Sequence, residues 1–217
     1  MASPLIRTLP YGPLQACGHM VRLDDTVVLI DPSITTDRLP AGWPLPRLML
    51  ATHAHFDHIA TIDAWTDVCG APLSIHRLET GWLSSAQHNL SVHMGEALKV
   101  VAQARPLDDG QILALNDDWV IEVWHTPGHS PGSACYLLSG PDGPAALFSG
   151  DTLFAGSIGR TDLPGGSVPV MRQTLRMLIT KLEQLAAPDL PIYPGHGPAT
   201  LWSRELEHNL WLAQMKE

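Results

Sequence analysis

The stretch Thr52-His-Ala-His-Phe-Asp-His58 places three histidines and one aspartate within six residues. It directly follows the apolar run Leu48-Met-Leu-Ala51, which has the pattern of a short buried strand. Imidazole and carboxylate groups are the usual protein ligands of zinc and other first-row metals. A lone histidine is usually only hydrogen-bonded, but several such groups buried without a metal would cost about 1–3 kcal/mol for each unpaired one. The stretch therefore predicts a metal site where a strand ends and a loop begins.

Three later turns repeat this arrangement, because each follows a predicted strand and presents a metal-binding residue. They are Gly128-His129, Gly150-Asp151 and Gly195-His196. Each one alone is more simply explained as an ordinary turn, but four strand ends with the same chemistry are not. The complete set of candidate metal ligands is His53, His55, Asp57, His58, His129, Asp151 and His196. Seven ligands exceed the three or four of a single zinc ion, so we expect two metals that share a bridging carboxylate.

Periodicity predicts strands and helices around these turns in two similar runs. The first run has strands at 14–23, 26–30, 48–51 and 72–75, with a helix at 57–68 between the last two. A strand–helix–strand unit of this kind favours parallel pairing. The second run has strands at 108–115, 119–124, 134–138, 145–148 and 190–193, with helices at 168–185 and 202–215. Two sheets packed face to face with helices outside would satisfy this pattern.

Composition places the chain among globular proteins. Of its 217 residues 45% are hydrophobic and 16% are charged, and the net charge of -9 argues against a nucleic-acid or anionic-membrane surface. Cys17, Cys69 and Cys135 are an odd number without CxxC spacing, so neither a disulfide framework nor a cysteine-rich zinc site is expected. No secretory leader or membrane-spanning run is evident, and we expect a cytoplasmic protein.

The joint motif set resembles the metallo-β-lactamase superfamily over roughly residues 12–198. Within that superfamily, the run from Phe154 to Gly166 and the Thr-Pro-Gly-His-Ser-Pro-Gly-Ser run at 126–133 resemble the short glyoxalase II-type proteins. The resemblance implies an α+β fold, a four-layer αββα sandwich, formed by residues 1–217 as a single domain. It also implies that His53, His55 and His129 hold one metal, that Asp57, His58 and His196 hold the second, and that Asp151 bridges them.

The same resemblance implies a metal-dependent hydrolase that cleaves a thioester such as S-lactoylglutathione. Two divalent metal ions, with zinc expected first and iron or manganese as alternatives, would supply a metal-bound hydroxide that attacks the carbonyl. Asp57 has a second expected role in orienting that hydroxide. No Gly-x-Ser-x-Gly elbow occurs, and neither Ser130 nor Ser149 is needed as a nucleophile. The expected partner is a small, glutathione-linked thioester, although longer glyoxalase II enzymes hold glutathione with an additional C-terminal helical segment.

Two alternatives and one further residue stay open at the level of sequence. Persulfide dioxygenases share the Gly-Arg-Thr-Asp loop but bind a single iron, and lactonase or β-lactamase activity is a weaker alternative on the same scaffold. A non-enzymatic protein that keeps metals for structure is disfavoured, since structural zinc sites are closed and rich in cysteine. Arg160 could hold a substrate carboxylate by a bidentate pair, or it could simply pair with Asp162.

Overall fold

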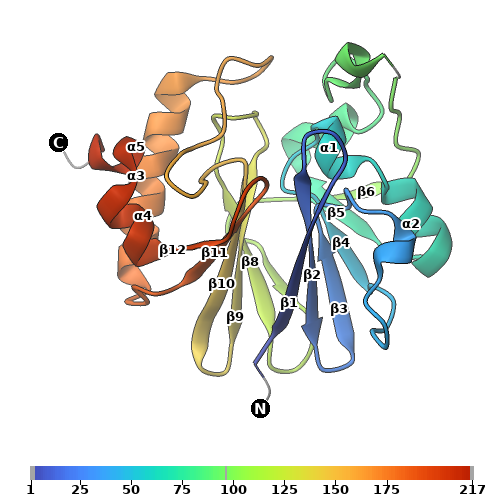
Figure 1. Cartoon of the computed structure of the whole chain (residues 1–217), viewed down its shortest axis with the longest axis horizontal. Helices are drawn as coiled ribbons and strands as arrows, with labels where there is room; N and C mark the ends of the chain where they lie inside the picture. Colours follow the sequence, from blue (N-terminus) through green and yellow to red (C-terminus); the bar gives the residue numbers. More distant parts are fainter. Residues whose placement is uncertain (1–2, 96, 216–217) are drawn as a thin grey trace. The chain divides into compact units, whose positions relative to one another are not determined.

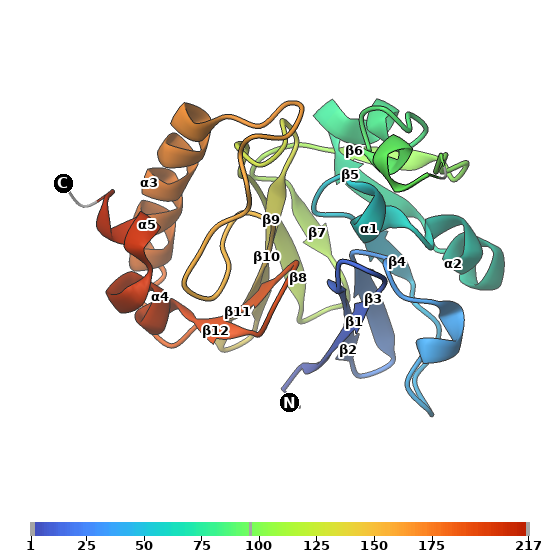
Figure 2. The ribbon, with the colours of Figure 1, turned by 45° about the horizontal axis from the view of Figure 1, so that its top comes forward.

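A computed structural model describes residues 3–95 and 97–215 of the chain. The chain divides into two compact units, Met1–Asp108 and Asp109–Glu217. In the described part, each unit holds one six-stranded sheet together with its own helices, as the colours of Figures 1 and 2 make plain.

The sheet of the first unit has the strand order β1-β2-β3-β4-β5-β6. Strands β1 to β3 pair antiparallel, whereas β3, β4, β5 and β6 pair parallel. The strands are β1 (Leu5–Tyr11), β2 (Ala16–Leu23), β3 (Thr26–Ile30), β4 (Leu48–Leu50), β5 (Leu73–His76) and β6 (Ala104–Leu107). The helices are η1 (Thr36–Arg38), α1 (Phe56–Ile59), α2 (Ile62–Cys69), η2 (Arg77–Trp82) and η3 (Ser91–Met94). The predicted parallel strand–helix–strand unit is therefore present as β4–α1–α2–β5.

One hydrophobic core joins the helices of this unit to its sheet. Ile59, Ile62 and Trp65 are fully buried and pack with Met49 and Leu73 of the central strands. The Trp65 indole donates a hydrogen bond to the carbonyl of Ile34 at 2.8 Å, which satisfies its polar atom inside the core. The core holds the helices against the strand end from which the His53 loop leaves.

The single helix predicted for 57–68 is wrong, because the chain breaks it into α1 and α2. Thr61 lies between them with non-helical backbone angles (φ -117°, ψ 13°). Its hydroxyl bonds to the carbonyls of Pro32 and Ile34 at 2.8 and 2.7 Å, and its amide donates to Pro32 as well. A threonine side chain that finds acceptors outside the helix competes with helix continuation. Helix α2 ends at Gly70, which is left-handed at φ 63°.

The sheet of the second unit has the order β12-β11-β10-β9-β8-β7, and its pairs are antiparallel except for the parallel β10–β11 pair. The strands are β7 (Ile112–Ala114), β8 (Val120–His125), β9 (Ala134–Gly140), β10 (Gly143–Gly150), β11 (Pro191–Pro194) and β12 (Thr200–Leu201). The helices are α3 (Val168–Gln184), α4 (Trp202–His208) and α5 (Leu210–Ala213), which lie together beside the sheet in Figure 1. Helix α3 buries Met171, Leu175, Leu178 and Leu182 in a core with Leu137, Leu147 and Ile192.

The helix predicted for 202–215 is also interrupted, at Asn209. Asn209 is extended (φ -78°, ψ 112°), and its amide group bonds to the carbonyl of Ser157 and the carboxylate of Glu205 at 3.0 and 2.9 Å. The side-chain oxygen of Asn209 accepts a hydrogen bond from the backbone amide of Trp211 and so caps α5. The helix is broken here because Asn209 bonds to the loop that contains Ser157, and helical periodicity in the sequence gives no sign of this contact.

Each unit thus supplies one sheet and one set of helices, the two halves that the predicted αββα arrangement requires. Cys17 and Cys135 lie buried in β2 and β9, as expected of small apolar residues. Among the described residues, no helix has both the length and the apolar character that crossing a membrane would need.

Candidate metal centre

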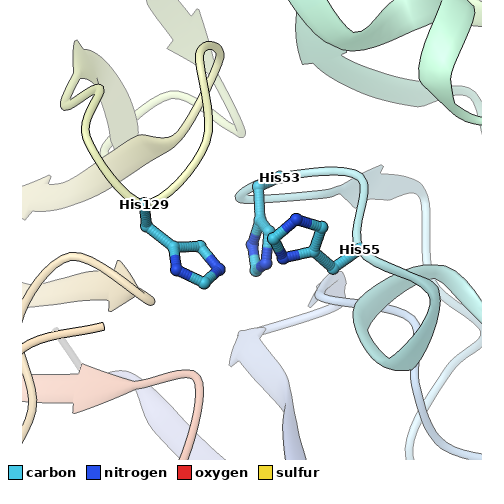
Figure 3. A group of neighbouring side chains, drawn as sticks. All are labelled: His53, His55 and His129. Atoms are coloured by element: carbon cyan, nitrogen blue, oxygen red, sulfur yellow. The ribbon is translucent and has the colours of Figure 1, made fainter. Parts of the chain in front are cut away.

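In the first unit, four of the predicted ligands gather in the loop after β4 and in α1. The backbone amide of Ala51 donates a hydrogen bond to the Ser74 carbonyl at 3.0 Å, which extends the β4–β5 pairing to the start of this loop. The ring centroids of His53 and His55 are 4.6 Å apart and nearly perpendicular, and the rings of His53 and His58 are 4.2 Å apart. Figure 3 shows His53 and His55 reaching from this loop. The ligand atoms of His53 and His55, of His53 and His58, and of Asp57 and His58 lie within 4.8 Å of each other.

A buried carboxylate behind this loop fixes its geometry. Asp31 is fully buried and accepts hydrogen bonds from the Thr52 amide at 2.6 Å and the Thr52 hydroxyl at 2.9 Å. The Nδ1 atom of His58 lies 2.9 Å from the same carboxylate. An imidazole that donates from Nδ1 to a carboxylate keeps Nε2 as a lone-pair donor, the form in which histidine binds metals.

A second buried carboxylate, Glu79, accepts a hydrogen bond from the amide of Ala54 at 2.5 Å. This bond fixes the backbone between His53 and His55. Sequence reasoning missed both supporting residues. Asp31 could have been noticed because it follows a strand end directly, as the ligand residues do, whereas nothing near Glu79 in the sequence marks it.

In the second unit, Asp151 lies between two imidazoles. Its Oδ2 atom is 3.4 Å from Nε2 of His129 and 3.6 Å from Nε2 of His196. These separations are longer than a charge-assisted hydrogen bond of about 2.7–2.9 Å. Two ligands on one tetrahedral zinc, with bonds of about 2.0–2.1 Å, would lie about 3.3–3.4 Å apart. In the first unit the Asp57–His58 pair is 3.7 Å apart, so the spacing of all three pairs suits ligands that share an ion.

The loop that carries His129 is pressed against α3. Gly128 has a φ of 138°, and a Cβ atom there would lie 2.6 Å from the Cα of Met171. The Gly128 carbonyl accepts from the amide of Ser167 at 2.8 Å, and the Pro127 carbonyl accepts from the Thr174 hydroxyl at 2.6 Å. Only glycine permits this approach, so Gly128, the residue before His129, is required by packing.

The loop after Asp151 holds both Asp151 and His129 through its backbone. The Nδ1 atom of His129 lies 2.7 Å from the carbonyl oxygen of Arg160, which leaves Nε2 of His129 facing Asp151. A Cβ atom on Gly159 would lie 1.9 Å from the carbonyl oxygen of Asp151, so the two segments touch at this glycine. The 154–166 loop therefore has a positioning role that its sequence resemblance did not specify.

The side chain of Arg160 forms a bidentate pair with Asp162. The two N···O distances are 2.8 and 2.9 Å, and both side chains are well exposed. The hydrogen bond from Arg160 lowers the pKa of Asp162 to about 2, so this carboxylate stays charged at physiological pH. The pairing foreseen as one alternative for Arg160 is thus present, and the guanidinium group remains accessible from solvent.

Helix α4 and the residue that follows it clamp the start of the same loop. The buried carboxylate of Glu205 accepts from the amide of Gly156 at 2.8 Å and from the Thr200 hydroxyl at 2.7 Å. Asn209 donates to the Ser157 carbonyl, as described above. The ring of Phe154, in the clamped segment, lies edge-on to the ring of His196 with centroids 6.0 Å apart. The clamped segment is therefore in contact with one of the predicted ligands.

Replacing Asn209 by alanine should test this clamp. We expect the free energy of unfolding to fall by about 1–3 kcal/mol, because buried carbonyl and carboxylate groups lose their donor. That loss corresponds to a melting temperature lower by roughly 2–12 °C for a chain of this size. Metal affinity, measured by competition with a chelator, should fall as well. Asn116→Ala is the matched control, since Asn116 caps the β7–β8 turn by accepting from the amides of Asp118 and Trp119. Equal metal affinity in the two variants would show that the clamp is only structural.

The remaining histidines and serines of interest have local roles. His88 stacks on Trp82 with ring centroids 5.2 Å apart and bonds to Ser85, while His76 is buried in β5. The Ser130 hydroxyl lies 2.7 Å from that of Ser133, and the Ser149 hydroxyl donates to the Leu153 carbonyl at 2.7 Å. Both serines are buried.

The donor set fits metal ions. It consists of imidazole nitrogens and carboxylate oxygens, the ligands suited to zinc, iron and manganese. The Nδ1 atoms of His58 and His129 donate hydrogen bonds to acceptors, so their Nε2 atoms carry the lone pairs that can bind a metal ion. Each of the two clusters of histidine and aspartate therefore offers the donor atoms that such a metal ion needs.

Comparison with known proteins agrees with this chemistry. The family model described as "Metallo-beta-lactamase superfamily" matches residues 12–196. The "Probable metallo-hydrolase YqgX" of Bacillus subtilis (strain 168) is 34% identical over 215 residues, which are 95% of this chain and 96% of that protein.

Two solved structures are similar in both sequence and fold. The BLEG-1 B3 metallo-β-lactamase is 34% identical with a TM-score of 0.85, over 96% of this chain and 99% of that one. TTHA1623, solved in a di-iron-bound form, is 32% identical with a TM-score of 0.80, over 95% of this chain and 100% of that one. The likeness confirms the predicted fold class, the α+β sandwich of the metallo-β-lactamases. On its sequence, its fold and its histidine and aspartate clusters, the chain belongs to the metallo-β-lactamase superfamily.

Proposed function

We propose that this protein is a metal-dependent thioester hydrolase, with S-lactoylglutathione or a related acylglutathione as its substrate. His53, His55 and His129 would hold one divalent cation, and Asp57, His58 and His196 would hold the other, with Asp151 bridging them. Zinc is the first candidate, and iron or manganese are the alternatives. The chain would act as a single domain, and its proposed location is the cytoplasm.

The position of Asp151 is the observation that carries the proposal. One carboxylate oxygen lies 3.4 Å from His129 and 3.6 Å from His196, two residues that the motif resemblance assigns to different metals. A carboxylate with an imidazole on each side is suited to bridging two cations. Structural zinc sites, by contrast, are usually rich in cysteine and contain a single ion.

The chemistry follows from the donors around the bound cations. Divalent cations of this kind lower the pKa of a coordinated water towards 7 and polarise a carbonyl. Asp57, whose side chain is 11% exposed, can accept a hydrogen bond from the attacking water and orient it towards the thioester carbon. Asp31 and the Arg160 carbonyl hold the imidazoles of His58 and His129 in the required tautomer. The products would be a carboxylic acid and a thiol.

Turnover of S-lactoylglutathione by the purified protein, with its metal content measured on the same sample, tests the proposal directly. We expect acid and thiol release together with about two metals per chain. The Gly-Arg-Thr-Asp loop at 159–162 is shared with persulfide dioxygenases, so glutathione persulfide should be assayed in parallel. One iron per chain with oxygen uptake, and no thioester cleavage, would contradict the proposal and identify the protein as a persulfide dioxygenase.

A second candidate is β-lactam hydrolysis, which is favoured by the 34% identity to BLEG-1. The same donors would serve, because both reactions add water to an acyl carbon. Parallel assays with a chromogenic cephalosporin and with S-lactoylglutathione separate the two, and the larger kcat/KM identifies the better substrate class. The resemblance of the 154–166 loop to glyoxalase II-type proteins is the reason for placing the thioester first.

Arg160→Ala should raise KM roughly tenfold with little change in kcat, if the exposed guanidinium holds a carboxylate of the substrate by charge-assisted hydrogen bonds. Asp162→Ala is the matched control, because it removes the partner of Arg160 and leaves the guanidinium available. We expect its KM to be unchanged or lower. A loss of thermal stability in both variants with normal kinetics would reduce Arg160 to a purely structural role.

A further inference from the structure

A pocket of about 560 Å³ lies in the first unit beside Asp57. Its volume falls within the range of about 300–1,000 Å³ that is usual for small-molecule sites. Apolar side chains form much of its lining, namely Tyr11, Pro13, Phe56, Met94 and Leu98. Phe56 directly precedes the proposed metal ligand Asp57, so the pocket begins where the proposed reaction takes place.

Hydrogen bonds fix the wall of this pocket. Asn89 is fully buried, and its backbone carbonyl oxygen accepts a hydrogen bond from the amide of Phe56 at 2.8 Å. Its side chain donates to the carbonyl of Leu98 at 3.0 Å and accepts from the amide of Ser91 at 3.0 Å. The Ser91 hydroxyl in turn accepts from the amide of Leu98 at 2.8 Å. The described segments on both sides of η3 are therefore joined to the start of α1, and the pocket exists before any ligand enters.

The lining indicates what the pocket can hold. Tyr11 and Met94 are 38% and 46% exposed, so apolar surface faces solvent beside a polar centre. Lys99 also lines the pocket, and its exposed ammonium can remain in water while its stem adds apolar surface. A lactoyl group has three carbons and is too small to cover this surface, and glutathione is too polar to match it.

We propose that this pocket binds the apolar chain of the substrate's acyl group, which makes thioesters of medium-chain acids, about six to ten carbons long, the preferred substrate class. The inference rests on the proposed thioester hydrolysis and specifies its acyl group. The chain would lie along Phe56, Met94 and Leu98, and the thioester carbon would lie next to Asp57. Hydrolysis would add water across the C–S bond and release the medium-chain acid and the thiol.

The test compares acetyl, hexanoyl and decanoyl thioesters of glutathione with the metal-loaded, full-length protein. Burying one methylene group contributes about 0.8 kcal/mol at most, so kcat/KM should rise by about two- to fourfold per methylene. Ala60, which is exposed and lines the pocket, offers a way to fill it. Ala60→Trp should bring the decanoyl rate down towards that of the acetyl thioester. Val101→Trp is the matched control, since Val101 is 78% exposed and does not line the pocket. Its chain-length dependence should equal that of the wild type.

Calorimetric binding of decanoate and of acetate gives a readout that does not depend on turnover. We expect decanoate to bind at least tenfold more tightly than acetate to the wild type and to Val101→Trp, and to lose this advantage in Ala60→Trp. Thioester hydrolysis with no dependence on chain length would overturn the pocket assignment and leave the hydrolase intact. Tight decanoate binding without cleavage of any thioester would overturn the hydrolase and retain the pocket. Equal binding of decanoate in all three proteins would also contradict the assignment.

Discussion

Asp151→Ala is expected to lower kcat for the proposed thioester hydrolysis by at least three orders of magnitude while the protein stays folded. Asp151 lies between His129 and His196, and its removal takes away the carboxylate that we propose bridges the two cations. Metal ions contribute several kcal/mol of charge stabilisation to such reactions, and each 1.36 kcal/mol is worth a factor of ten in rate. Metal content should fall from about two per chain to one or none.

The measurement needs kinetics, metal analysis and thermal melting on the same preparation. Asp142→Ala is the control, because Asp142 is an exposed aspartate in the β9–β10 turn of the same unit. We expect it to keep wild-type rate and metal content. Asp151→Asn retains an oxygen donor without the charge and should bind metal more weakly than the wild type. An Asp151→Ala protein that keeps two metals and more than a tenth of the wild-type rate would contradict the bridging assignment.

Much of this site was predictable from sequence because its ligands are local signals. Each candidate ligand sits in a turn next to a strand or in the helix that follows one, and the signal is the repetition of the same ligand chemistry at four strand ends. The structure brings His53, His55, Asp57 and His58 together in the first unit, and His129, Asp151 and His196 in the second. That all seven complete a single centre remains a prediction, as does the second role of Asp57.

The two errors in helix length have a common physical origin in long-range contacts. Both helix breaks occur where a polar side chain bonds to a distant segment, Thr61 to the 32–34 loop and Asn209 to the 154–157 loop. Helical periodicity reports the apolar face, which continues through each break. Edge strands β1, β6 and β12 were missed for a different reason. They are only partly buried or very short, so alternation is weak, and β1 and β6 each contain a proline.

Asp31→Ala is expected to have the largest effect on stability among the residues that support the site. The substitution leaves the Thr52 amide, the Thr52 hydroxyl and the His58 ring buried without their acceptor. Breaking a buried network of this kind costs about 3–5 kcal/mol, a large share of the 5–15 kcal/mol that stabilises most domains. Urea unfolding should show this loss, and metal affinity should fall by about 10- to 100-fold because His58 is no longer oriented.

Asp31→Asn separates the two roles of this carboxylate. The amide fills the same space, so the loss of stability should be smaller than for alanine. An NH2 group facing Nδ1 of His58 would, however, favour the tautomer with the proton on Nε2, and that nitrogen would then have no lone pair to offer a metal ion. We therefore expect metal affinity to fall about as far as in the alanine variant.

Asp63→Ala is the control for a carboxylate that only holds backbone. Asp63 accepts from the amides of Val101 and Ala102 in the same unit and has no predicted ligand among its partners. It should destabilise the fold without changing metal affinity. If Asp31→Asn kept wild-type metal affinity, Asp31 would be a structural residue and His58 would have to be oriented by its own packing. If Asp31→Asn lost metal affinity while Asp63→Ala kept it, the result would show that Asp31 promotes metal binding by fixing which ring nitrogen of His58 carries the proton.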